Sequence, residues 1–133
     1  MEELNLWDFL DTRGKNIILQ WVRDKRLSGR DRVRLNQKFA RLVQMDFSLA
    51  IATKLLAGPI YEHIYKLVIH GDVMLRPMLC KGPISNATEY TLLLGAVERG
   101  GRLPAKAREQ AAQNRQTVID NPSRRHTHER IPQ

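Results

Sequence analysis

The chain has 133 residues, of which 42% are hydrophobic and 27% are charged, and this composition excludes a fully disordered chain and favours one folded domain. No apolar run approaches the roughly 20 residues of a membrane-spanning helix, and the opening Met-Glu-Glu-Leu lacks the basic region of a secretory signal. The single cysteine, Cys80, excludes an internal disulfide and a cysteine-rich zinc module. We therefore expect a protein of the reducing cytoplasm.

The net charge is +8, from 22 Lys and Arg against 14 Asp and Glu. Residues 13–41 carry ten bases against two acids, and residues 99–133 carry eight against three. Two basic regions therefore flank a nearly neutral middle. Such a balance favours an anionic partner, nucleic acid above all, over a basic face that only meets solvent.

The first part of the chain predicts a short N-terminal element followed by helices. Residues 4–10 alternate weakly between apolar and polar, which fits either a short strand or one helical turn. After a turn signal at 11–14, Asn16 is placed to cap a helix with apolar residues at helical spacing, and Ser28 is placed to cap a second helix. Residues 49–56 predict a further short helical segment that ends at the following Gly-Pro pair.

The middle of the chain changes to the composition of β-strands. Residues 60–69 are rich in β-branched and aromatic side chains and predict a strand. A turn at 70–72 and a second strand at 73–80 follow. Residues 89–97 hold a tyrosine and three consecutive leucines, which predict a third strand that is largely buried.

The register of the first two strands follows from burial. A three-residue loop gathers the apolar side chains on one face, whereas a two-residue loop places Arg76 among them. We therefore expect the first register, which pairs Ile69 with Val73. It sets Lys66 directly opposite Arg76 on the exposed face.

A glycine pair ends the third strand, and Pro104 then opens a helix that runs to about Ile119. The residues beyond that helix are polar and basic. The sequence thus predicts an α+β fold: a small antiparallel sheet of three to four strands, two N-terminal helices packed on it, and a C-terminal helix. Residues 1–119 form one domain in this prediction, and residues 120–133 form a flexible tail.

Basic side chains of the expected sheet are the strongest candidates for chemistry. Lys66 and Arg76 face the same way, and Arg99 and Arg102 follow the third strand. Cleavage of RNA needs a base for the ribose 2′-OH and cations for the charge that grows on the phosphoryl oxygens, and it needs no metal. The alternative is that these residues only make an exposed face soluble. No serine–histidine elbow and no metal-ligand spacing appears, so we expect no Ser-His hydrolase, no metal and no cofactor.

Several segments resemble one known family. They are residues 58–76, the run 92–102 (LLLGAVERGGR), the alanine-rich helix that ends near Arg115, and the turn 11–14 with its Ile/Trp helix. Over residues 5–118 the chain resembles the phage-derived, HigB-like branch of the RelE/ParE toxin superfamily of type II toxin–antitoxin systems. The resemblance implies a RelE-like domain and a metal-independent messenger-RNA endonuclease that acts on translated message at the ribosome. It also implies a cognate antitoxin, often a helix-turn-helix protein.

The resemblance also assigns roles to residues. It places the catalytic groups at Arg76, Lys66, Arg99 and Arg102, with His126 or His128 as the base. Arg76 matches the arginine that contacts the scissile phosphate in that family. The chain departs from the family pattern at Glu98, where a lysine is common. Pro77 inside the second strand indicates an edge or a bulge.

The basic helices are the expected docking surface for nucleic acid. The residues assigned to it are Arg23, Lys25, Arg26, Arg30, Arg34, Lys38 and Arg41. Two alternatives to a nuclease remain open on the sequence. One is a non-catalytic toxin that, like ParE-type members, inhibits a protein target, and the other is a basic nucleic-acid-binding protein that does not cleave.

Overall fold

The computed structural model describes residues 3–133, and Met1 and Glu2, on which the expectation of no secretory signal partly rests, lie outside them. The helices are α1 (Ile17–Asp24), α2 (Gly29–Leu42), α3 (Phe47–Ala52), α4 (Ala107–Asp120) and the 3-10 helix η1 (Pro122–Arg124). The strands are β1 (Asn5–Phe9), β2 (Leu56–Tyr61), β3 (Ile64–Leu67), β4 (Ile69–His70), β5 (Met74–Leu75), β6 (Met78–Lys81), β7 (Glu89–Leu94), β8 (Val97–Glu98) and β9 (Arg125–Thr127). The α+β class is as predicted. In residues 3–133, no helix has the length and apolar character needed to cross a membrane.

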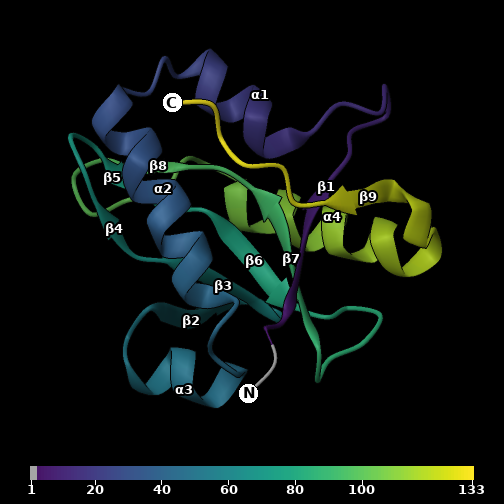
Figure 1. Cartoon of the computed structure of the whole chain (residues 1–133). Helices are drawn as coiled ribbons and strands as arrows, with labels where there is room; N and C mark the ends of the chain where they lie inside the picture. Colours follow the sequence, from purple (N-terminus) through teal and green to yellow (C-terminus); the bar gives the residue numbers. More distant parts are fainter. Residues whose placement is uncertain (1–2) are drawn as a thin grey trace.

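The sheet is larger than predicted. Six strands pair in the order β2-β3-β6-β7-β1-β9, and β4, β5 and β8 form a second sheet of three (Figure 1). The large sheet is mixed, because β1 pairs with β7 in parallel, with Leu6 opposite Tyr90, while its other pairs are antiparallel. The prediction of three to four antiparallel strands is therefore wrong in number and in direction.

The strand predicted over residues 60–69 is in fact part of a hairpin. A turn at Glu62 and His63 separates β2 from β3, and His63 has a φ of 58°, a left-handed conformation. The Gly-Pro pair at 58–59 lies within β2 and does not end a helix. The short helix α3 ends earlier, at Ala52, and it is capped by Asp46, whose side chain accepts from the Leu49 amide at 2.8 Å.

The hairpin around residues 70–72 exists, but its register is shifted by two residues. Ile69 pairs with Leu75, and Lys66 pairs with Met78, so Lys66 is not opposite Arg76. Because side chains alternate with period 2, a shift of two keeps the same faces, and the apolar ones are buried in either register. Pro77 lies where β5 ends and β6 begins, which is why one long strand does not form.

The helix caps are as predicted. The Asn16 side chain accepts from the amides of Ile18 and Leu19 at 3.0 and 3.1 Å, and Ser28 Oγ accepts from the Asp31 amide at 3.1 Å. These short-range bonds satisfy amides that the first turn leaves free.

The helices cover both faces of the large sheet, with α1 and α2 on one and α4 on the other (Figure 1). Successive residues of the central strand β7 point to opposite faces. Leu92 therefore joins the core under α1 and α2, and Leu93 joins the core under α4. Both are fully buried.

The expected flexible tail is packed against the domain instead. Strand β9 pairs with β1, and Arg125 forms an ion pair with Glu89 at 2.7 Å. Beyond the strand, Ile131 is buried, and its amide and carbonyl bond with the Asn36 side chain at 3.0 and 2.9 Å. A polar segment is thus held by specific partners that lie far away in the sequence.

Candidate nucleic-acid interface

Two adjoining cavities of about 690 and 620 Å³ surround the segment that links β8 to α4. They share residues 102–106, and together we call them the basic groove. Its lining includes the cations Lys25, Lys66, Arg99, Arg102, Lys106 and Arg108. Among the described lining residues, Glu98 is the one acid. The groove therefore has the charge that attracts phosphate.

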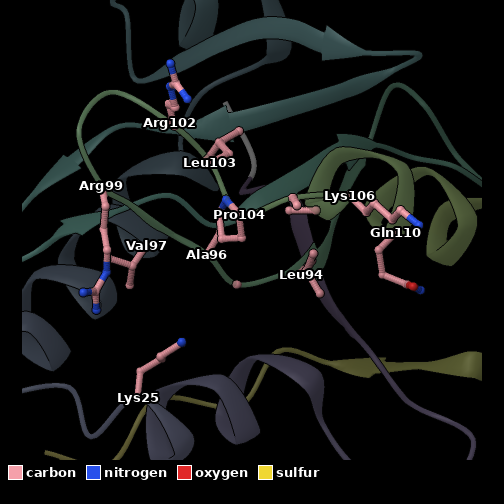
Figure 2. A pocket seen from close by; sticks show the side chains of 13 residues that line it. Lys25, Leu94, Ala96, Val97, Arg99, Arg102, Leu103, Pro104, Lys106 and Gln110 are labelled. Carbon is pink, nitrogen blue, oxygen red and sulfur yellow. The ribbon is translucent and has the colours of Figure 1, made fainter.

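A tight turn presents two of these arginines. Gly100 and Gly101 have φ values of 57° and 75°, a conformation that side chains rarely adopt. Arg99 and Arg102 flank the pair and exchange backbone hydrogen bonds of 2.9 and 3.0 Å. Both side chains are exposed, and they leave the turn in different directions, with Arg99 on the side of Lys25 (Figure 2).

Helix α1 brings a cation from a distant part of the sequence to the same place. Gly95 lies against the Trp21 ring so closely that a Cβ on Gly95 would overlap it. This contact fixes the end of α1 beside the link between β7 and β8. Lys25, the C-cap of α1, then lies across the first cavity from Arg99, while Pro104 forms part of the wall (Figure 2).

The start of α4 adds to the positive potential of the groove. Lys106, the N-cap residue of α4, lines both cavities, and Ala107, the first residue of the helix, lines the first. No side chain caps this end of α4, so first-turn amides lack the partner that an N-cap supplies. The N-terminus of a helix attracts anions through these amides and the helix dipole.

Glu98 joins the two cations predicted on the sheet. Its Oε1 accepts from Lys66 Nζ at 3.1 Å, and its Oε2 accepts from Arg76 Nη2 at 3.3 Å. The hydrogen bond from Lys66, with the charge of Arg76, holds the pKa of Glu98 below its ordinary value. The carboxylate is therefore ionised at neutral pH, and it neutralises one of its two partners.

Arg76 is buried, which corrects the prediction that it lies on an exposed face. It is 4% exposed, and its Nη1 donates to the carbonyls of Ile69 and Leu75 at 3.2 and 2.8 Å. A guanidinium held in this way ties β5 to its neighbours and has no open path to a phosphate. The scissile-phosphate role that the resemblance gives Arg76 does not fit this position.

The two histidines lie away from the basic groove. Strand β9 is an edge strand of the large sheet, and four strand intervals separate it from β3, roughly 19 Å at the usual spacing. His126 is exposed there, and His128 Nδ1 lies 2.8 Å from Asp8 Oδ1 with its ring edge-on to Phe39. Neither histidine lies beside Lys66, so the structure does not bring the expected base together with the sheet cations.

The cations expected on the helices spread over different surfaces. Arg30, Arg34 and Arg41 are exposed along α2, and Lys38 is half-buried there. Arg23 and Arg26 line a separate cavity of about 390 Å³ near Pro132. Lys25 is the member of this set that reaches the basic groove. The sequence analysis did not name Lys106 and Arg108 as site residues. Their position at the start of a helix, shortly after Arg102, could have indicated that they share its surface.

In residues 3–133 no three His, Cys, Asp or Glu side chains gather in a way that could hold a metal ion. Comparison of the chain with protein families, with curated proteins and with solved structures finds no match.

Proposed function

We propose that this protein is a toxin-type endonuclease that takes the phosphodiester backbone of messenger RNA in the basic groove and cleaves it without a metal. The observation that carries the proposal is the groove itself, which is lined by five exposed cations, the start of a helix and a single carboxylate. Phosphate contacts from Lys and Arg supply most of the affinity in nucleic-acid binding.

The apolar part of the groove lining favours a single strand over a duplex. Its floor and walls include apolar residues, among them Leu94, Val97, Leu103 and Pro104, beside the cations. A single-stranded RNA can place its backbone against the cations and an unstacked base against such a surface. A duplex keeps its bases stacked and paired and has no unstacked base to offer this surface.

The biological setting in this proposal comes from the sequence resemblance. The target is message under translation, and the partner is a cognate antitoxin, expected to be a helix-turn-helix protein. An antitoxin that covers the basic groove with acidic side chains would block access of RNA.

Mapping of message ends tests this proposal. A translated reporter message is analysed by primer extension after brief induction of the wild type, of Arg99→Glu/Arg102→Glu, or of the matched pair Arg34→Glu/Arg41→Glu on α2. We expect new 5′ ends with the wild type and with the α2 pair, and intact message with the groove pair.

Two results would contradict the proposal. Intact message with a folded, toxic wild type would indicate inhibition of a protein target. Loss of binding and toxicity with the α2 pair, and not with the groove pair, would move the nucleic-acid surface to the helices.

A further inference from the structure

Glu98 is a carboxylate among the cations of the basic groove, where an acidic side chain opposes the binding of phosphate. It lies at the end of β8 and lines the second cavity with Lys66, Arg102, Lys106 and Arg108. Its side chain keeps 16% of its surface exposed, so it reaches solvent from a partly enclosed site.

The hydrogen bonds of Glu98 fix its orientation without using all its acceptor capacity. Each carboxylate oxygen accepts one bond, Oε1 from Lys66 and Oε2 from Arg76. An ionised carboxylate offers about four acceptor sites. At least one lone pair on each oxygen is therefore free for a hydroxyl in the groove. Arg76 is itself anchored on two carbonyls, so it holds the carboxylate as a buried support.

The charge balance around Glu98 favours this carboxylate as a proton acceptor. When a carboxylate takes a proton, Lys66 and Arg76 lose the negative charge that balances them. In RNA cleavage the same event adds negative charge to the phosphoryl oxygens. The ammonium of Lys66, which is half-buried at the groove, is then free to bind those oxygens.

We propose that Glu98 is the general base that activates the ribose 2′-OH, with Arg76 as the residue that positions it and Lys66 as the cation for the phosphate. The inference rests on the proposed function. The 2′-OH proton passes to a carboxylate oxygen of Glu98 while O2′ bonds to the adjacent phosphorus. The bond from phosphorus to O5′ then breaks. The leaving 5′ oxygen takes a proton from solvent, and Glu98 returns its proton to solvent. The products are a 2′,3′-cyclic phosphate and a 5′-hydroxyl.

Kinetics with a short single-stranded RNA test the role of Glu98. The proteins compared are the wild type, Glu98→Gln, Glu98→Asp and the matched control Glu109→Gln, whose carboxylate lies on α4 and does not line the groove. We expect Glu98→Gln to lower kcat by about 100-fold or more, which is the usual contribution of a general base. Affinity for the same RNA with a 2′-deoxyribose at the cleaved nucleotide stays at least as high as in the wild type, because a negative charge has been removed.

Two further measurements separate catalysis from structure. Glu98→Asp keeps a carboxylate and is expected to cleave faster than Glu98→Gln even where the two melting temperatures are equal, whereas a purely structural ion pair predicts activity losses that follow the fall in melting temperature of each variant. The kcat of the wild type is expected to stay flat between about pH 5 and pH 8, because the base remains ionised there, whereas a histidine base would give an acid limb near pH 6.5.

The outcomes separate the inference from the proposed function. If the wild type binds RNA and cleaves neither this RNA nor the translated reporter message, the proposed endonuclease fails. If the wild type cleaves and folded Glu98→Gln cleaves as fast, the proposed function stands and Glu98 is not the base. An acid limb near pH 6.5 that disappears in His126→Ala/His128→Ala would also overturn the assignment.

Discussion

The salt dependence of RNA binding is the sharpest quantitative consequence of the basic groove. Five of its cations are exposed and carry no partner among the ion pairs of the described residues: Lys25, Arg99, Arg102, Lys106 and Arg108. Lys66 is left out because Glu98 neutralises it. If each exposed cation meets one phosphate, a plot of log K against log salt has a slope of about −0.7 × 5, or about −3.5, for single-stranded RNA.

Replacement of Arg99 and Arg102 by alanine leaves three contacts. The expected slope falls to about −2.1, so the loss of affinity from about 50 to about 200 mM salt falls from about 100-fold to about 20-fold. Fluorescence anisotropy of a labelled oligouridine over a salt series measures both slopes. Arg34→Ala/Arg41→Ala removes the same charge from α2 and is expected to leave the slope at about −3.5.

The reasoning would be refuted by the reverse pattern. A slope that changes with the α2 pair and is unmoved by the groove pair would mean that phosphates bind the helices. A wild-type slope near zero would mean that the groove does not neutralise phosphate at all, whatever its affinity for other ligands.

The remaining predictions concern stability and reactivity. Gly95→Leu places a side chain in the space that the Trp21 indole ring occupies. It should lower the free energy of unfolding, measured by chemical denaturation, by about 1–3 kcal/mol or more. Gly29→Ala, where a Cβ meets open space, is the control and should cost nothing. Arg125→Ala leaves Glu89 buried without its ion-pair partner and should cost about 3–5 kcal/mol at neutral pH. Burial alone would raise the pKa of Glu89, but hydrogen bonds from Arg125 and two backbone amides hold it below 4.5. The wild type should therefore lose this stability as the pH falls below about 4.5 towards the folded-state pKa, so the gap between the two proteins narrows in acid; a constant gap would contradict the ion-pair explanation. Burial raises the pKa of Cys80 to about 12, so this thiol should resist a thiol reagent at mildly alkaline pH until the protein unfolds, and rapid labelling of the native protein would show that the site opens.

Local chemistry in the sequence is sufficient to place the helix starts and turns. Asn16 and Ser28 cap their helices because the amides that they accept from are two and three residues away. The Gly-Gly turn after the third strand and the turn at 70–72 follow in the same way from residues that are neighbours in the chain. No tertiary contact needs to be known to predict these features.

Strand pairing depends on contacts that the sequence pattern does not distinguish. The predicted and observed hairpin registers differ by two residues, and both bury the same apolar face, so hydrophobic alternation cannot choose between them. The observed register is accompanied by a third strand, β8, which pairs with β5 and sets Met74 opposite Glu98. The parallel insertion of β1 beside β7 is decided in the same way, by partners more than 80 residues apart.

The sequence by itself determined the α+β class, the helix caps, and the presence of basic residues in the loop after the third strand, because each follows from composition or from near neighbours. Only the tertiary structure decided which cations share a surface. It buries Arg76, places Glu98 between Lys66 and Arg76 as the ion-pair partner of both, and brings Lys25 from α1 to the groove. It also packed the polar C-terminal segment, since Glu89 and Asn36 supply partners that pair with it only across the fold. The charge of a residue is fixed by its type, whereas its solvent exposure and its neighbours are fixed by long-range packing.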